Sequence, residues 1–116
     1  MKDGIYQVRF QGQAGAGMAM LVFDGGQIYG TDTEAGKYDG TYIFQPATGQ
    51  VDAKVKVTFP PNVISVFGMQ HPFEWAFEVE TTFNGKAEKG VLALKNSLGA
   101  PIQAQYAFMR TLPQAG

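Results

Sequence analysis

The sequence contains no cysteine, only one histidine and only two serines among its 116 residues. Without cysteine, the chain can form no disulfide, no zinc–thiolate site and no thiol nucleophile. The single histidine, His71, has no adjacent nucleophile and acid with which to form a hydrolytic triad, and a protein zinc site usually needs three or four side-chain ligands. We therefore expect no enzymatic activity, no bound metal and no cofactor.

Charge is also scarce in this chain. Charged residues make up 16% of the sequence, and nine Lys and Arg against ten Asp and Glu leave a net charge of -1. No basic face is indicated, so we expect no direct binding to nucleic acid. No segment approaches the roughly 20 apolar residues that span a bilayer, and the N-terminus lacks the apolar core of a signal peptide. We expect a cytoplasmic protein with no membrane span.

Alternation of apolar and polar residues is the main pattern in the sequence. Phe73–Phe83 places apolar residues, most of them large, at nearly every second position, with acidic or small residues between them. Val51–Phe59 has the same alternation with Asp52, Lys54, Lys56 and Thr58 between the apolar residues. A half-buried strand sorts residues onto two faces in this way, whereas a helix does not. If these two strands pair antiparallel, the lysines lie opposite the glutamates.

Turn residues divide the chain into eight predicted strands. Gly25-Gly26 and Asn84-Gly85 predict tight hairpins, and Pro46–Gly49 and Ser97–Pro101 predict longer turns. The predicted strands are Ile5–Phe10, Met18–Phe23, Gln27–Thr31, Tyr42–Gln45, Gln50–Phe59, Phe73–Phe83, Glu88–Lys95 and Ile102–Thr111.

We predict one all-β domain over residues 1–116, an eight-stranded antiparallel up-and-down barrel, because closure removes exposed strand edges. A two-sheet sandwich stays open as an alternative, since periodicity does not report closure. One segment departs from the alternation, after Pro60-Pro61. Asn62 as a helix cap and Gly68 as a helix end predict one short helical turn near residues 62–68.

Six aromatic side chains fall on predicted inward faces. An eight-stranded barrel is just wide enough either to pack solid or to hold one small ligand, as in a lipocalin-like cavity. Both interpretations stay open, and the ligand in the second would be a small apolar molecule. The candidate cavity-lining residues are Phe59, Trp75, Phe77, Phe83, Tyr106 and Phe108.

The apolar segment around the predicted helical turn has three interpretations. Val63, Val66 and Phe67 would share one side of the turn. They could plug one end of the barrel, act as a gate for a ligand, or form a contact between subunits. Low net charge and few charged residues favour self-association.

The N-terminal third of the chain resembles a known family. Met1–Tyr6, Gly15–Gly17, Asp24–Asp32 and Tyr38–Tyr42 are similar to the GrlR family, small negative regulators of type III secretion genes and their uncharacterised relatives. A Gly-Gly pair, a Gly-x-Asp motif and a Tyr-x-Gly-x-Tyr motif carry this likeness. Beyond residue 42, only the length, the proline-rich break and the layout of strands match.

The resemblance implies a lipocalin-like barrel that forms a homodimer and acts by binding a protein, a helix-turn-helix transcription activator. The best-known family member contacts this activator through an acidic hairpin, but the corresponding stretch here, Gln45–Gln50, contains no carboxylate. That contact therefore cannot be carried over. We predict a non-enzymatic regulatory protein that acts as a dimer by protein contact, with a carrier of a small apolar ligand as the alternative.

Overall fold

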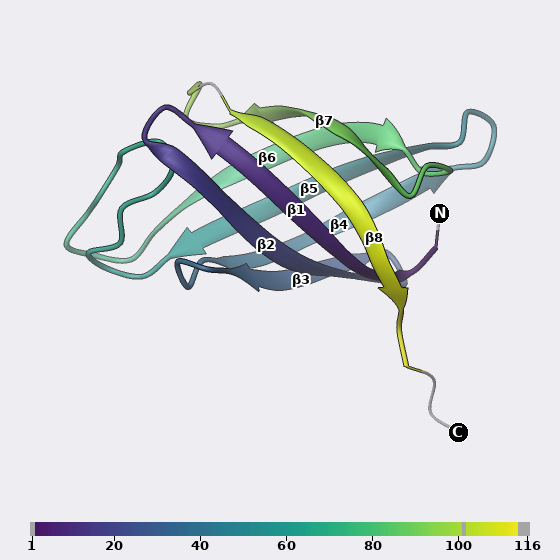
Figure 1. Ribbon diagram of the computed structural model, residues 1–116, viewed down its shortest axis with the longest axis horizontal. Helices are drawn as coiled ribbons and strands as arrows, with labels where there is room; N and C mark the ends of the chain where they lie inside the picture. The colour runs from purple at the N-terminus through teal and green to yellow at the C-terminus, as the bar shows by residue number, and fades with distance from the viewer. Residues whose placement is uncertain (1, 101, 114–116) are drawn as a thin grey trace.

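In the computed structural model, which describes residues 2–100 and 102–113, eight antiparallel strands close into one barrel (Figure 1). Each strand pairs with its neighbours in sequence and the last pairs with the first, so the predicted barrel is confirmed over the sandwich. The described chain offers no helix that could cross a lipid bilayer. The strands are β1 (Gly4–Gly12), β2 (Gly15–Asp24), β3 (Gln27–Asp32), β4 (Lys37–Gln45), β5 (Gln50–Phe59), β6 (Trp75–Asn84), β7 (Lys89–Asn96) and β8 (Gln103–Thr111).

The predicted register between the lysine-bearing and glutamate-bearing strands is confirmed. In the β5–β6 ladder, Lys54 lies opposite Glu80 and Lys56 lies opposite Glu78. The Lys54 ammonium is 3.8 Å from the Glu80 carboxylate, but both side chains are largely exposed and the ion pair contributes little stability. Its main effect is on register, because a slip of one residue would turn the apolar side chains of both strands to the solvent.

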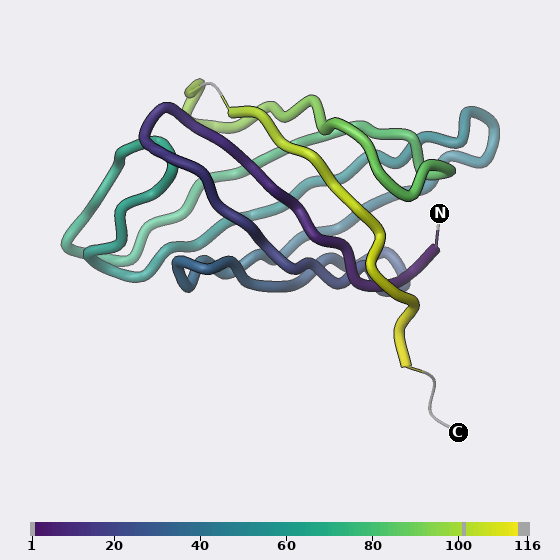
Figure 2. Tube along the Cα trace, in the orientation of Figure 1, coloured from purple at the N-terminus to yellow at the C-terminus, as the bar shows by residue number. Residues whose placement is uncertain are grey.

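The barrel has two unlike ends (Figure 2). At one end, which we call the terminus end, β1 starts and β8 stops, and short turns join β2 to β3, β4 to β5 and β6 to β7. At the other end, the loop end, the hairpins β1–β2, β3–β4 and β7–β8 turn, and a long connection over residues 60–74 joins β5 to β6. The start of β1 and the end of β8 thus lie at the opposite end of the barrel from the long connection.

The two glycine-containing hairpins differ from each other. Gly25 and Gly26 have φ of 57° and 93°, which is the left-handed geometry that the tight β2–β3 turn requires. The two-residue turn predicted at Asn84-Gly85 does not form, because β7 begins only at Lys89. Instead Asn84 opens a longer turn: its side-chain oxygen accepts a hydrogen bond from the Lys86 amide at 2.9 Å.

The helical turn predicted near residues 62–68 does not form, and the segment is a folded loop. Asn62 has a φ of 68°, whereas a helix N-cap takes an extended conformation. The hydrogen bonds also run in the wrong direction for a helix: the Asn62 amide donates to the His71 carbonyl at 2.7 Å and the Ser65 amide to Met69 at 3.0 Å. These bonds tie the two arms of the loop to each other, leaving a single turn between Ser65 and Gly68.

Strand β7 is shared unevenly between its two neighbours. Its first half, residues 89–92, pairs with β8, while its second half, residues 93–96, pairs with β6. Each of these ladders has four residue pairs, whereas the β5–β6 ladder runs the whole length of both strands. The wall on either side of β7 is therefore the part of the barrel with the fewest paired residues.

Candidate functional site

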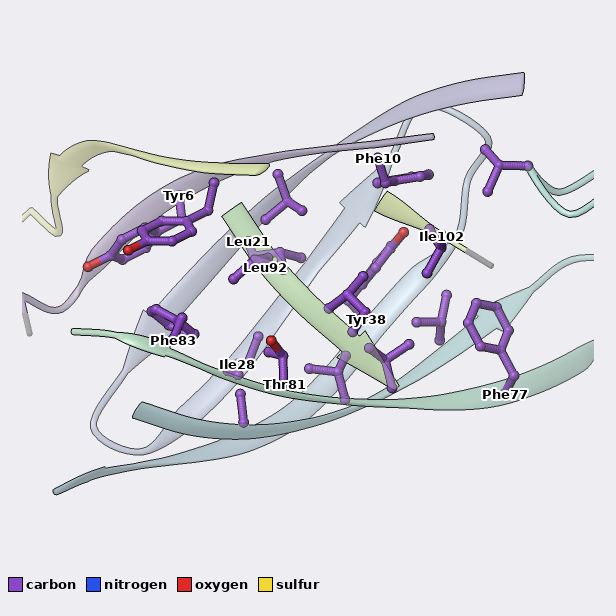
Figure 3. Close-up of a pocket in the computed structure, with 18 of the residues that line it drawn as sticks. Tyr6, Phe10, Leu21, Ile28, Tyr38, Phe77, Thr81, Phe83, Leu92 and Ile102 are labelled. Atoms are coloured by element: carbon purple, nitrogen blue, oxygen red, sulfur yellow. The ribbon is translucent and has the colours of Figure 1, made fainter. Parts of the chain in front are cut away.

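An apolar cavity of about 90 Å³ lies inside the barrel (Figure 3). All eight strands contribute to its wall, together with Val66 and Phe67 of the long connection and Ile102 before β8. This wall is made almost entirely of aliphatic and aromatic side chains. Only four of the lining side chains carry a polar atom: Tyr6, Tyr38, Thr81 and Tyr106.

Each of these four hydroxyls already donates a hydrogen bond to the protein, so none has a free proton to donate to a ligand. A cavity with this lining suits a hydrocarbon, and an apolar cavity without free polar groups stays dry. The hydroxyl bonds run from Tyr6 to the Lys2 carbonyl at 2.7 Å, from Tyr38 to the Asp32 carboxylate at 2.8 Å, from Thr81 to the Ala93 carbonyl at 2.9 Å and from Tyr106 to the Asn84 carbonyl at 3.0 Å.

Burial keeps the tyrosines of the cavity protonated. Desolvation raises the pKa of Tyr6 to about 12. Desolvation also raises the pKa of Tyr106 and, together with the charge of Asp32, that of Tyr38 well above the ordinary value. All three hydroxyls are therefore hydrogen-bond donors at neutral pH.

Aromatic rings close the terminus end of the cavity. Tyr6 lies against Phe23, and Phe83 lies against Tyr106, with ring centroids 4.9 Å apart in both pairs. Phe108, predicted to line the cavity, sits at the rim instead, 5.3 Å from the Tyr6 ring. Its outer side is covered by the Lys2 ammonium, 5.4 Å from the ring centroid.

A second aromatic cluster closes the loop end. Phe67 of the long connection meets Phe77 edge to face, with centroids 5.3 Å apart, and Phe77 stacks on Phe59 at 6.0 Å. Trp75 packs on Phe59 at 5.5 Å but does not line the cavity. Its indole N–H is buried and finds no hydrogen-bond partner in the described part of the chain, unlike the tyrosine hydroxyls of the cavity.

The long connection forms a cap that is held on the β1–β2 hairpin. The Ala14 amide donates to the Val66 carbonyl at 2.8 Å. Only glycine fits at position 12 beside it, because a Cβ there would lie 2.4 Å from the same carbonyl oxygen. Val66 and Phe67 line the cavity from this cap, whereas Val63 packs beside them on the Phe59 and Phe77 cluster.

Of the nine candidate residues from the sequence, the cavity wall includes Phe59, Val66, Phe67, Phe77, Phe83 and Tyr106, but not Val63, Trp75 or Phe108. Sequence reasoning missed the contribution of the first four strands. The signal was present in the same alternation, which turns every second residue inward. The missed wall residues there include Tyr6, Leu21, Phe23, Ile28 and Tyr38.

The outer surface of β1, β2 and β3 carries several apolar side chains, beside Arg9, which lies opposite Met18. Ile5 lies opposite Val22, and Val22 lies opposite Tyr29, so three apolar side chains form a row across three strands. Met20 is 36% exposed and Tyr29 is 42% exposed. We call this surface the Met20 face; it consists of Ile5, Gln7, Met18, Met20, Val22 and Tyr29.

The β4–β5 hairpin has no negative surface at its tip. The nearest carboxylate, Asp52, accepts hydrogen bonds from Gln45 and from Thr82. The side chain of Lys86 packs against Gly49 at the tip. A basic partner would therefore meet a lysine at this hairpin.

His71 has the surroundings of a packing residue. Its ring stacks on Phe73 and meets Trp75 edge to face, with centroids 5.0 Å apart in both cases. Within residues 2–100 and 102–113, no three His, Asp or Glu side chains gather where they could hold a metal ion.

No protein-family model matches the chain, and the comparison with curated proteins finds no similar sequence. The likeness to the GrlR family remains a hypothesis. It rests on the motifs of the N-terminal third.

Proposed function

We propose that the chain is a non-enzymatic binding protein of the GrlR type, which acts as a homodimer through protein–protein contact. The Met20 face supports this proposal. Ile5, Val22 and Tyr29 form a row on the outer surface of the sheet. In a barrel exposed to solvent on all sides we would expect charged residues at such positions, as on the outer surface of β5 and β6. Apolar side chains that adjoin on the outside of a sheet favour a partner that covers them.

The size of the cavity favours contact on the outside over transport of a lipid inside. Pockets for drug-sized ligands have volumes of roughly 300–1,000 Å³. The interior of this barrel has about 90 Å³, and its polar groups are all engaged with the protein. A fatty acid does not fit this space.

The proposed partner, by resemblance to the family, is a helix-turn-helix transcription activator in the cytoplasm. The hairpin Gln45–Gln50 offers such a partner no carboxylate. The contact is therefore proposed to differ from the acidic contact of the best-known family member, with apolar surface replacing charge.

Native mass spectrometry of Met20→Glu tests the dimer. The wild type is expected to be dimeric and Met20→Glu monomeric, because a carboxylate on the Met20 face would be desolvated in the contact. Ile43→Glu is the matched control: Ile43 is 68% exposed on the outside of β4 and away from this face. A monomeric wild type, or loss of the dimer in both variants, would contradict the proposal.

The regulatory role is tested by co-purification of the tagged protein from its native cells. A helix-turn-helix activator is expected with the wild type and with Ile43→Glu. Direct binding of the purified activator is then measured by calorimetry. Absence of binding would leave no support for the regulatory role.

A second candidate function is a lipocalin-like carrier of a small apolar molecule. The cavity itself favours it, since a closed barrel whose polar groups are all paired still leaves about 90 Å³ unfilled. Benzene is a suitable probe, because it enters dry cavities lined by aliphatic and aromatic side chains. Methyl NMR shifts of Leu21 and Ile28, which face the cavity, are expected on adding benzene; their absence would exclude the carrier.

A further inference from the structure

We propose that the cavity opens sideways, through the seam between β7 and β8 near the loop end, with Leu94 and Ile102 as its gate. This inference rests on the carrier function, for which it identifies the route of a small apolar ligand. It differs from entry under the cap of residues 60–74, which the sequence suggested as the gate.

The backbone pairing between β7 and β8 stops where the proposed entrance begins. Leu92 is opposite Ala104, and the same register would place Ala93 opposite Gln103, but the ladder ends at Leu92. Beyond the gap, the hairpin closes again where the Asn96 side-chain amide donates to the Ala100 carbonyl at 2.8 Å.

Side chains alone separate the cavity from the outside along this seam. A groove on the outer surface runs beside β7, β8, β1 and β2, and its wall includes Lys95, Gln103 and Met18. The groove and the cavity share four wall residues, so these side chains are the partition between them. They are Phe10, Leu92, Leu94 and Ile102, three of which are labelled in Figure 3.

The other closures of the cavity are held by hydrogen bonds. On the far side of β7, the gap between β6 and β7 is filled by Tyr106, whose hydroxyl contacts the Asn84 and Ala87 carbonyls at 3.0 and 3.2 Å. The cap is held by the bond from Ala14 to Val66. Opening either of these closures would break a hydrogen bond, whereas opening the seam parts aliphatic side chains only, so the seam is the easier route.

Engineered disulfides can test this route cleanly, because the chain has no native cysteine. The seam staple is Ala93→Cys with Gln103→Cys, the next pair in the β7–β8 register. The control is a cap staple, Ala14→Cys with Gly68→Cys, since a Cβ at Gly68 would lie 3.2 Å from the Ala14 Cβ. Because Gly68 has a φ of 80°, a cysteine there is strained, so the stability of this variant is measured beside its exchange rate. Benzene exchange is followed by methyl NMR in the oxidised and reduced forms of both proteins.

We expect the oxidised seam staple to slow benzene entry and exit by at least about tenfold with little change in affinity, since it blocks a local opening. Reduction should restore the wild-type rate, and the cap staple should leave the rate unchanged. Slower exchange with the cap staple alone would overturn the proposal in favour of the cap. Absence of benzene binding in the wild type would instead refute the carrier function, and the entrance with it.

A pair of leucine variants tests the gate without a disulfide. Leu94→Ala removes a side chain from the partition, whereas Leu21→Ala removes one from the cavity wall on β2, away from the seam. Faster exchange is expected only for Leu94→Ala. Equal acceleration by both variants would mean that cavity size controls the rate, which would contradict a gate at the seam.

Discussion

The two ends of the barrel interior are closed by aromatic rings that are anchored differently. At the terminus end, Tyr6 and Tyr106 pack their rings against phenylalanines and donate their hydroxyls to backbone carbonyls. At the loop end, the ring of Phe67 is held by packing, and the indole N–H of Trp75 has no hydrogen-bond partner within residues 2–100 and 102–113. The two ends are therefore anchored differently: by the hydroxyls of the rings at the terminus end, and by ring packing and the backbone bond from Ala14 to Val66 at the loop end.

The largest expected difference between the two ends is in the loss of stability when one aromatic ring is removed from each end. Phe23 is 6% exposed and contacts three other aromatic rings, so Phe23→Ala should destabilise the protein by about 3–5 kcal/mol. Phe67→Ala should cost only about 1–2 kcal/mol, because the loop can collapse onto the space. Urea unfolding followed by circular dichroism measures both. Equal losses of stability in the two variants would mean that the cap is as rigid as the terminus end, which would contradict the difference between the two ends.

High pH should loosen the terminus end by ionising its tyrosines. The pKa of Tyr6 is raised from 10.0 to about 12 by burial, so folding favours the protonated form. The resulting stability is complete below pH 10 and is lost as the pH rises from 10 to about 12. The loss from Tyr6 should be on the order of 2 kcal/mol. Urea unfolding at several pH values measures this loss.

The variant Tyr6→Phe tests whether ionisation of Tyr6 causes the loss of stability at high pH. Tyr6→Phe cannot ionise at that position, so its stability should fall less steeply above pH 10 than that of the wild type. The same dependence on pH in both proteins would place the effect elsewhere.

Removing one hydrogen-bonded hydroxyl should lower the stability less than removing the Phe23 ring or ionising Tyr6. Tyr106→Phe leaves the ring in place but removes the donor to Asn84 and Ala87, at an expected cost of about 1–1.5 kcal/mol. Tyr29→Phe is the matched control, since its exposed hydroxyl is 3.4 Å from Asp24 and should contribute close to nothing. A cost for Tyr106→Phe no larger than that of the control would show that packing alone holds the terminus end.

The strand pattern could be predicted from the sequence because it depends on local information, whereas closure of the barrel depends on the pairing of β8 with β1, which periodicity does not report. The alternation in β5 and β6 determines which residues face inward, and the charges on Lys54 and Glu80 are consistent with one register only. The geometry of the Gly25-Gly26 turn follows from glycine itself, since few other residues adopt positive φ.

The cap could not be predicted in the same way, because its conformation depends on residues far away in the chain. Asn62 and Gly68 are ordinary helix-end residues, yet the segment is held by Ala14 and by bonds between its own arms. The unpaired half of β7 on the side of β8 also depends on residues that are far away in the chain. Leu92 and Leu94 continue a regular strand pattern, and nothing local indicates that β7 changes its partner between them.

The smallest expected change in stability is for Trp75→Phe, which removes the unpaired indole N–H. Whether the stability rises or falls is the informative result. Trp75→Phe keeps an aromatic ring against Phe59 and removes a buried donor without a partner, so stability should stay the same or rise by up to about 1 kcal/mol. Trp75→Ala, which removes the ring as well, should cost roughly 3 kcal/mol. The measurement must use circular dichroism, because Trp75 is the only tryptophan.

A loss in Trp75→Phe close to that in Trp75→Ala would mean that the indole N–H is satisfied, and that the loop end is anchored like the terminus end. A neutral or stabilising result would mean that the loop end keeps an unsatisfied polar group that the terminus end does not have. Such a group lowers the free energy of unfolding at the loop end only. The two ends would then differ in the hydrogen bonding of their rings, although aromatic rings close both of them.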